Sequence, residues 1–572
     1  MHDLVIRGGT IVDGMGTQAY SGDLAIDGNI IAQVGGKVGL GKREIDAAGA
    51  LVQPGWVDVH THYDGQGTWD PLIGPSCWHG VTTIVMGNCG VGFAPVRPDM
   101  HTDLIELMEG VEDIPGAALH EGVDWRWESF PEFMDALGAM NHAIDIGVQV
   151  PHSPLRAYVM GAAASGERPA TEGEMAQMAS LVEEGLASGA LGFTPSKTKF
   201  HRTSKNEHVP SYSADLQELR TIVGAMKKRG EGLIGVLSDF DQPEEDMAGL
   251  RQLSAESGRP LYYLLVQFDD KPDKWRRLLE LSRPNGDGAQ IHPQVCPRPV
   301  GFFLGLECSL HPFMSKAAYK EIRDLSLVDR VAQMRDPTFK QRVISEVRSH
   351  KSHIMQEVTG AFDKMFRLGD PPNYEPSEDQ SIAAIAAREG REPAEVAYDI
   401  LLERDGKELI FLPFTNYTSR NHDTIREMMT DDQALFGLGD GGAHCGLICD
   451  ASIPTYLLTH WVRDRQRGDR LPLEWIVHRQ TQANANFFGL NDRGALAPGM
   501  KADVNVIDFD GLQLRPPHMV RDLPAGGRRL IQEAQGYIAT VQTGAVTFEN
   551  GEHSGALPGG VIRGQQKGPQ AA

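Results

Sequence analysis

Two histidines one residue apart, in the segment GWVDVHTHYD at residues 55–64, are the first feature of this chain that could do chemistry. In an extended strand alternate residues point to the same side, so Asp58, His60 and His62 share one face. Neutral imidazole nitrogens are common ligands of divalent metals. A Pro-Gly pair precedes the segment and YDGQGTWD follows the valine run, as expected at a strand end. The histidine pair therefore predicts part of a divalent metal site.

A second chemical feature is the segment GLGDGGAHCG at residues 437–446. Its apolar strand ends on Asp440, and two glycines follow, which exposes the carboxylate at the carboxyl end of the strand, where barrel enzymes hold their catalytic groups. Such an aspartate can bind a metal and take a proton from water. A turn or helix N-cap explains an aspartate here equally well. The segment alone leaves both interpretations open.

The residues between these two segments alternate predicted helices and strands. A helical pattern at residues 171–189 runs into the strand ALGFT, and LQELRTIVGAMKKRG precedes GLIGVL in the same way. Such alternation predicts a parallel sheet with helical crossovers. An excursion at about 300–405 interrupts the pattern, which we expect to resume with ELIFLPF and LFGLGDGG. We therefore predict a barrel over residues 54–496 with one insertion.

Both ends of the chain are rich in short strands broken by Gly and Asp. Residues 1–53 contain LVIRGGTIVDG and GDLAIDGNIIAQVG, and residues 497–565 contain KADVNVIDFDG and YIATVQTGAVTFENG. Two strand-rich ends around a mixed centre predict one β domain assembled from both termini. The Gly- and Gln-rich tail after Gly559 is expected to fray.

Charge and composition narrow the class of protein and its partners. The 572 residues carry a formal net charge of −23, which repels nucleic acid and anionic membrane surfaces. No stretch approaches the ~20 apolar residues of a membrane helix, and the N-terminus lacks a secretory apolar segment. The six cysteines include no CxxC pair, which favours free thiols. We expect a cytoplasmic protein acting on a small molecule, and we leave a homo-oligomer open.

Taken together, the motifs resemble the amidohydrolase superfamily, and within it the N-acyl-D-amino-acid deacylases (D-aminoacylases). The resemblance runs nearly end to end, through AAGALVQPGWVDVHTHYDGQGTWDP, HGVTTIVMGNCGVGFAPVRP, GDGGAH and DRGALAPGMKADVNVIDFD. It implies an α/β fold, a (β/α)8 TIM-like barrel with a small β-sandwich domain built from both termini. It also implies amide hydrolysis by water activated on a divalent metal, usually zinc. By matched motif, the metal ligands are His60, His62 and Cys89, and the catalytic aspartate is Asp440.

The sequence departs from the family at two later barrel strands, where members ordinarily carry a histidine. GLIGVLSDFD has Leu237 and Ser238 at these positions, and PLYYLLVQFDD has Val266 and Gln267. Two ligands of the family's tightly held metal are therefore missing. We expect one ion rather than two, bound by the two histidines and the aspartate with the cysteine close by. The lysine after the second missing histidine, from a region that helps to hold the substrate carboxylate in the family, is absent too.

Substrate-binding residues are expected on the basic loop SKTKFHRTSKNEHVPS at residues 196–211, because it follows the strand ALGFT directly. Lys199, His201 and Arg202 lie where barrel loops meet substrate. An arginine fork can hold a carboxylate through two parallel hydrogen bonds. A solvated basic loop is an equally good interpretation.

Further candidates follow other strand ends, and two of them, His152 and Arg298, are predicted to bind substrate. His152 lies in VPHSPLR, Arg298 in IHPQVCPRP, and His444 just after GDGGA. A packing or supporting role is favoured over metal ligation for each. A carbamylated Lys197 or Lys199 is a weaker alternative ligand, because the branch of the superfamily that this sequence resembles uses the cysteine.

The sequence thus predicts a metal-dependent hydrolase of a C–N bond that deacylates an N-acyl-D-amino acid or a related N-acyl compound, with zinc as the expected metal and Asp440 as the proton acceptor. Because the family's lysine is missing, the first alternative is hydrolysis of a cyclic amide (lactam, imide or hydantoin) or an aryl amide. An alternative of another class is a barrel that has lost its metal and acts as a binding protein. A substrate panel separates the first two, and elemental analysis separates the third.

Overall fold

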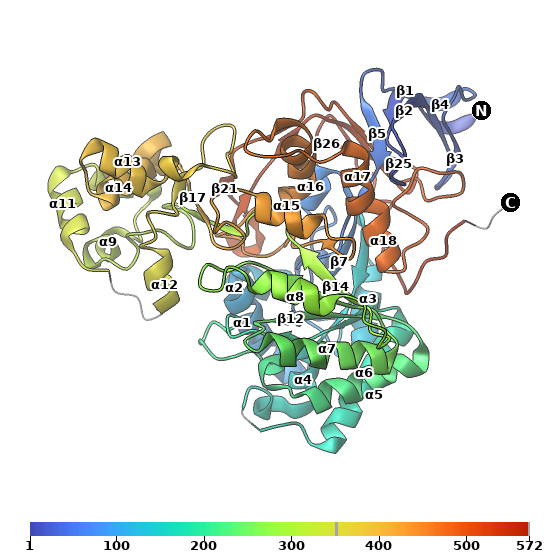
Figure 1. The fold of residues 1–572 in the computed structure, drawn as a ribbon, viewed down its shortest axis with the longest axis horizontal. Coiled ribbons are helices and arrows are strands. Elements are labelled where there is room, and N and C mark those ends of the chain that lie inside the picture. Colours follow the sequence, from blue (N-terminus) through green and yellow to red (C-terminus); the bar gives the residue numbers. More distant parts are fainter. Residues whose placement is uncertain (167, 349–352, 570–572) are drawn as a thin grey trace.

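Parallel strands that close into a barrel form the centre of the protein, in a computed structural model that describes residues 1–166, 168–348 and 353–569 (Figure 1). One parallel run consists of β6 (Trp56–Asp58), β7 (Val81–Met86) and β8 (Asp145–Val148). The other consists of β9 (Val150–Pro151), β10 (Gly192–Thr194), β12 (Leu233–Ser238), β13 (Leu261–Leu265), β14 (Ile291–Val295) and β18 (Leu435–Phe436). Gln149 alone separates β8 from β9 in the chain, so the two runs are continuous.

The barrel closes just beyond its first and last strands. Thr61 and Gly441 form a parallel bridge. The N–H of His62 donates to the carbonyl of Gly441 at 2.8 Å, and the N–H of Asp440 donates to the carbonyl of His60 at 3.0 Å. Parallel strands end at the same face of a barrel. The two chemical segments of the sequence therefore lie side by side at that face.

Helices cover the outside of the barrel, and capping residues set where they begin and end. Thr171 and Glu174 form a capping box at the start of α5, and Gly189 ends that helix with φ 110°. At the next helix, the side chain of Asp215 accepts from the N–H of Glu218, and Gly230 ends the helix with φ 70°. The helices between barrel strands are α1 (His101–Glu112), α2 (Gly116–Gly122), α3 (Phe130–Gly138), α4 (His152–Met160), α5 (Glu172–Ser188), α6 (Leu216–Arg229), α7 (Pro243–Ser257) and α8 (Lys274–Ser282).

Strands from both termini pair in one nine-stranded sheet beside the barrel (Figure 1). Its two halves meet where β5 pairs antiparallel with β19, with Val52 opposite Val506. The sheet contains β1 (His2–Ile11), β2 (Tyr20–Asp27), β3 (Ile30–Val34), β4 (Gly41–Asp46), β5 (Leu51–Pro54), β19 (Val504–Ile507), β24 (Tyr537–Gln542), β25 (Ala545–Glu549) and β26 (Glu552–His553). The predicted fold class, a barrel with a small β domain from both ends, is confirmed; the exact domain boundaries stay predictions.

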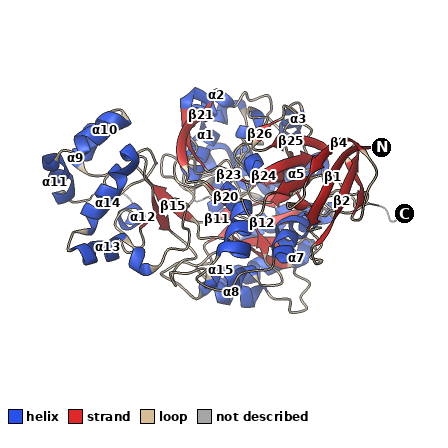
Figure 2. Ribbon diagram, turned by 90° about the horizontal axis from the view of Figure 1, so that it is seen from above, coloured by secondary structure: helices blue, strands red, loops and turns tan. Residues whose placement is uncertain are grey.

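The insertion between β14 and β18 has a hydrophobic core of its own and lies to one side of the barrel (Figures 1 and 2). It contains β15 (Gly301–Leu304), α9 (Ala317–Ile322), α10 (Leu327–Met334), α11 (Pro337–Ser345), α12 (His353–Val358), β16 (Phe366–Arg367), α13 (Ile382–Glu389), α14 (Pro393–Leu402) and β17 (Ile410–Pro413). The expectation that ELIFLPF resumes the barrel was wrong, because β17 pairs antiparallel with β15 and β16. An apolar run predicts a strand but does not identify its partner. The sequence segment SHKSHIM predicts a surface position for His350 in this insertion, and that residue lies outside the described residues.

Residues 562–566, in the Gly- and Gln-rich tail, pair through their backbone with other parts of the chain. The N–H groups of Ile562, Gly564 and Gln566 donate at 2.8 Å to carbonyls of the barrel and its helices. The expectation of fraying was therefore wrong for this stretch, because the glycines let the chain lie against other backbone.

All six cysteines are free. None of the described helices combines the length and hydrophobicity that a bilayer crossing requires.

Helices and short strands after the insertion complete the barrel wall and its rim. The helices are α15 (Asp423–Met429), α16 (Ile453–Tyr456), the π-helix η9 (Leu457–Asp464), α17 (Leu473–His478) and α18 (Asn484–Phe487). The short strands after the insertion are β20 (Gln513–Leu514), β21 (His518–Leu523), β22 (Gly527–Ile531) and β23 (Ala534–Gln535). One further short strand, β11 (Ser196–Lys197), lies before the insertion and pairs with β12.

Candidate metal centre at the barrel mouth

Four side chains converge where the barrel strands end; we call His60, His62, Cys89 and Asp440 the mouth cluster. Nε2 of His60 lies 3.3 Å from Sγ of Cys89 and 3.4 Å from Oδ1 of Asp440. Nε2 of His62 lies 3.6 Å from the same oxygen. Ligand atoms of the two histidines and the cysteine all lie within 4.8 Å of one another. The structure thus brings together the four residues that the sequence proposed as metal ligands.

The backbone that carries two of these side chains is strained. Cys89 has φ 54° and Asp440 has φ 43°, a left-handed conformation that costs a non-glycine residue on the order of 1 kcal/mol or more. The neighbouring glycines fit where no side chain would. A Cβ on Gly87 would lie 2.3 Å from the carbonyl of Gln149, and one on Gly439 would lie 2.3 Å from Asp58. Strain of this kind is typical of residues held for a function.

Hydrogen bonds behind the cluster fix the orientation of His60. Its Nδ1 lies 2.7 Å from Oε1 of Gln294, at the end of β14. An amide oxygen only accepts, so we assign the hydrogen to Nδ1, which leaves the lone pair of Nε2 facing Cys89 and Asp440. Metal-binding histidines are oriented in this way. Asn88 donates from its side chain to the carbonyls of Thr61 and Val85, which joins the ends of β6 and β7.

A buried carboxylate that sequence reasoning missed supports His62 from behind. Glu112, at the end of α1, is 2 % exposed. Its Oε1 lies 3.4 Å from Nδ1 of His62, and its Oε2 lies 3.5 Å from Nε2 of His444. A glutamate is rarely buried so completely without a partner. The segment ELMEGVED gave no sign of this role, because an acidic helix end ordinarily lies in solvent.

The pKa values of the cluster show how strongly burial and charge act on it. Burial lowers the pKa of His60 to about 4 and raises that of the Cys89 thiol to about 11. Burial also opposes ionisation of Asp440, but hydrogen bonding from His62 and the charge of both histidines lower its pKa to about 2. Burial disfavours charge on His62 too, yet Glu112 and Asp440 raise its pKa well above the usual value. Asp440 is therefore ionised at neutral pH.

The three residues of the basic loop that were predicted to bind substrate lie in different surroundings. Burial, with a smaller electrostatic influence of His62 and His444, lowers the pKa of His201 to about 3, and its Nδ1 lies 3.0 Å from Oγ of Ser196. Lys199 is exposed, with Nζ 3.7 Å from Asp241. Arg202 donates to the carbonyl of Asn206 and contacts His208, both within its own loop. Of the three predicted residues, His201 is the one whose pKa responds to the mouth cluster.

The other two substrate-binding candidates are buried in networks of their own. His152, which directly follows β9, contacts Glu218 at 2.9 Å and Ser211 at 3.0 Å. Arg298 donates to Asp450 at 2.6 Å and to the carbonyl of Cys449 at 2.7 Å. The second network anchors the loop that follows Asp440.

The strand ends that lack the family's histidines are occupied by local contacts. The side chain of Gln267 donates to the carbonyl of Pro272 at 3.0 Å, and its backbone N–H donates to Asn416 at 2.7 Å. Ser238 accepts from the N–H of Phe240, while Leu237 and Val266 pack against the barrel core. The residues at the ends of β12 and β13 therefore stabilise the local structure.

The fold and the mouth cluster together point to a class: (β/α) barrel enzymes, whose chemical groups gather at the carboxyl ends of the strands. Comparison with known proteins then identifies the family. Residues 43–548 match the amidohydrolase family, and the chain belongs to it.

The chain is similar to two deacylases of Alcaligenes xylosoxydans xylosoxydans. It is 34% identical to N-acyl-D-aspartate deacylase over 564 residues, 98% of this chain and 95% of that protein. It is 31% identical to N-acyl-D-glutamate deacylase over 519 residues, 89% of this chain and 88% of that protein. Both likenesses extend over most of the two chains compared.

Solved structures share the fold. N-acyl-D-glutamate deacylase from Bordetella bronchiseptica, complexed with zinc and a phosphonate inhibitor, has a TM-score of 0.65 at 22% identity, covering 98% of this chain and 99% of that one. A D-aminoacylase has a TM-score of 0.65 at 20% identity, covering 99% and 100%. The chain is accordingly a metal-dependent hydrolase acting on C–N bonds other than peptide bonds, which confirms the predicted family and enzyme class.

Proposed function

We propose that this protein removes the acyl group from an N-acyl-D-amino acid by hydrolysing its amide bond at the mouth cluster. The observation that carries the proposal is the convergence of His60, His62, Cys89 and Asp440 at the barrel mouth. The supporting comparison is the 34% identity, over 98% of the chain, to N-acyl-D-aspartate deacylase.

The donor set fits one zinc ion. Imidazole nitrogens, a thiolate and a carboxylate are the ligands that zinc prefers, and donor atoms 3.3–3.6 Å apart match the edges of a tetrahedral zinc site with bonds of about 2.0–2.3 Å. His60, His62 and Asp440 would hold the ion with Cys89 beside it, and the bound ion would polarise the amide carbonyl and lower the pKa of a water molecule. One ion is expected because Gln267 and its neighbours make local contacts in place of the family's histidines.

Proton transfer falls to Asp440. Its ionised Oδ1 faces both histidines of the HxH pair, so it is placed to accept a proton from the attacking water. It then delivers that proton to the leaving nitrogen, which departs as an amine. Gln294 and Glu112 hold the two imidazoles in place during these steps.

Substrate contacts are assigned to the residues nearest the cluster. His201 and His444 lie within electrostatic reach of the mouth cluster and of each other, so their imidazoles can contact the polar groups of the substrate. Lys199 and Arg202 make contacts within or beside their own loop and are assigned a lesser part. His152 and Arg298 support the surrounding loops through their buried ion pairs.

Hydrolysis of a cyclic or aryl amide is the second candidate, favoured by the absence of the family's lysine after β13. The test is a panel of N-acetyl-D-aspartate, N-acetyl-D-glutamate, N-acetyl-D-leucine, their L-enantiomers, a hydantoin and an acetanilide, assayed with zinc-loaded protein. The proposal expects turnover of at least one D-substrate and at most trace turnover of its enantiomer. Activity confined to the hydantoin or the anilide would replace it with the second candidate.

A further inference from the structure

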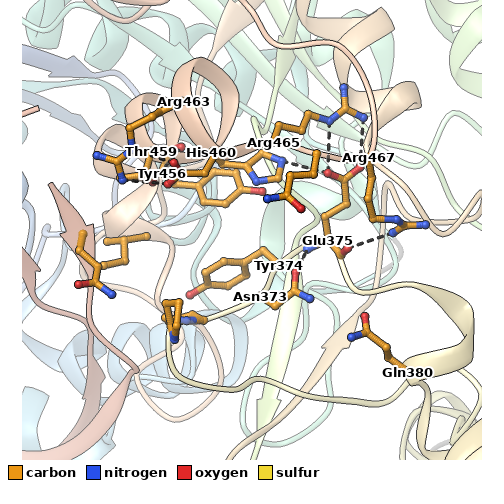
Figure 3. Close-up of a pocket in the computed structure, with 16 residues that line it drawn as sticks. Asn373, Tyr374, Glu375, Gln380, Tyr456, Thr459, His460, Arg463, Arg465 and Arg467 are labelled. Atoms are coloured by element: carbon orange, nitrogen blue, oxygen red, sulfur yellow. Dashed lines mark hydrogen bonds and ion pairs between the residues drawn. The ribbon is translucent and has the colours of Figure 1, made fainter. Parts of the chain in front are cut away.

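A second group of metal-ligating side chains lies apart from the mouth cluster; we call Glu375, His422 and His460 the lateral cluster. Glu375 and His460 line a cavity of about 330 Å³ (Figure 3). His422 contacts both of them. Ligand atoms of the three residues lie within 4.8 Å of one another. We propose that the lateral cluster binds one divalent transition-metal ion, which ties the insertion to the barrel wall.

The three ligands come from three separate parts of the chain. Glu375 lies in the insertion, after β16; His422 directly precedes α15; and His460 lies on the π-helix η9. None of these residues belongs to the mouth cluster or to the predicted substrate loop. An ion bound by all three would cross-link the insertion to two helical segments of the barrel wall, as structural zinc sites do.

The distances between the donor atoms suit a single ion. Nδ1 of His422 lies 3.2 Å from Nε2 of His460, which lies 3.2 Å from Oε2 of Glu375. The third edge, from Nδ1 of His422 to Oε2 of Glu375, is 3.9 Å. Donors about 2.0–2.2 Å from one ion lie roughly 3.0–3.9 Å apart over the usual range of coordination angles.

A backbone carbonyl fixes the orientation of His422. Its Nε2 lies 2.9 Å from the carbonyl oxygen of Tyr374, which can only accept. The ring hydrogen is therefore assigned to Nε2, and the lone pair of Nδ1 points into the cluster. A histidine whose other nitrogen donates to a carbonyl is the usual arrangement at a metal site.

The carboxylate of Glu375 keeps one acceptor position for the cluster. Its Oε1 accepts from the N–H of His422 at 2.7 Å and from Arg465 at 3.1 Å, while Oε2 accepts from Arg465 at 3.2 Å. A carboxylate has about four acceptor positions. The fourth, on Oε2, faces His460, and Figure 3 shows His460 and Arg465 approaching the carboxylate from different sides.

The charge of Arg465 is shared with a second carboxylate. Its guanidinium also donates to Asp423 at 2.7 Å and lies over the ring of Trp461. Arg467 also approaches, donating to the backbone carbonyl of Glu375 at 3.0 Å. The two carboxylates balance the two arginines, so a cation at the lateral cluster is not opposed by a net positive charge from these groups. His460 is 15% exposed toward the cavity, which gives an ion a route of entry.

The competing interpretation is a hydrogen-bond network without metal. A proton on Nε2 of His460 could be donated to Glu375 or to His422, and the hydroxyl of Tyr456 lies 3.2 Å from Nδ1 of His422. Both interpretations use the same contacts. They differ in the number of ions per chain, which can be counted.

The test measures zinc per chain by inductively coupled plasma mass spectrometry, after loading with zinc sulfate and dialysis into metal-free buffer. Four full-length proteins are compared: wild type, the lateral variant H422Q/H460Q, the mouth variant H60Q/H62Q/C89S, and the combination. The expected counts are two, one, one and none. The lateral variant is also expected to keep the wild-type kcat, and His478→Gln, which removes a histidine bonded to the carbonyl of Gly14, serves as the matched control with two ions.

A second readout does not depend on the folding of the lateral variant. The mouth variant, whose lateral cluster is intact, is loaded with cobalt(II) and is expected to show visible d–d bands and to melt several degrees higher than without metal. If the mouth variant binds no zinc or cobalt, the lateral cluster is a hydrogen-bond network only and the proposal is overturned. If the lateral variant still bound two zinc ions per chain, both ions would lie at the mouth cluster, and the proposal would likewise be overturned. Failure of the mouth to bind zinc would contradict the proposed function and leave the lateral count unchanged.

Discussion

The mouth and lateral clusters each bring histidines and a carboxylate together, but they differ in what balances the charge. Among the described residues, the ion-pair partners of Asp440 and Glu112 are histidines alone. In the lateral cluster, Glu375 already faces the guanidinium of Arg465. Because uncompensated buried carboxylates favour a cation, the mouth should bind metal far more tightly than the lateral cluster. Histidine clusters of similar geometry can thus differ in affinity through the arginine beside them.

The largest expected effect is on catalysis at the mouth. Asp440→Asn removes the proton acceptor and should lower kcat by about 10³-fold or more, because general acid–base catalysis contributes on the order of 10²–10⁴. Zinc content should stay near the wild-type value, since both histidines and the cysteine remain. Steady-state kinetics and elemental analysis check this. Asp432→Asn, an exposed aspartate before β18, is the matched control; full activity of Asp440→Asn would refute the assigned role.

The next largest effect is on zinc affinity, through the two residues that orient His60 and His62. Glu112→Gln and Gln294→Leu should each weaken zinc binding about 10–100-fold, as is typical for residues that orient metal-bound histidines. Competition with a chromophoric chelator gives the affinity at the mouth, best measured in the H422Q/H460Q background. Unchanged affinity in both variants would show that the two histidines are held by the backbone alone.

A smaller effect separates the two halves of the basic loop. His201→Ala should lower kcat/KM about tenfold for N-acyl-D-amino acids, because the imidazole interacts electrostatically with the mouth cluster. Lys199→Ala and Arg202→Ala should stay within about twofold of wild type, since exposed ion pairs and contacts within a loop contribute little. Kinetics on the three variants provides the check. A larger loss in Lys199→Ala than in His201→Ala would reverse the assignment.

Sequence reasoning identified the mouth because its chemistry is carried by short local patterns. Alternation placed His60 and His62 on one face, and the strand ending on Asp440 placed that carboxylate at the same edge; Cys89 came from the family resemblance. Glu112 and Gln294 were missed, because the local sequence around a helix end or a strand residue does not indicate which distant side chain it will contact. Their roles depend on tertiary packing around the barrel.

The lateral cluster could not be predicted for the same physical reason. Glu375, His422 and His460 lie on three segments that only the folded insertion brings together, and no short spacing links them. The strand ELIFLPF shows the related limit for the fold, because its apolar pattern fits a barrel strand and an antiparallel strand equally well. Local pattern predicts the type of an element more reliably than its partner.

The central claim, that one metal ion at the mouth cluster supports hydrolysis, is tested most directly by reconstitution. The H422Q/H460Q protein is stripped with chelator, dialysed, and titrated with zinc while deacylation of the preferred N-acyl-D-amino acid is followed. We predict that activity is absent without metal, rises linearly, and reaches its plateau at one zinc per chain. Full activity in the stripped protein, or a plateau that requires a second equivalent, would contradict the account.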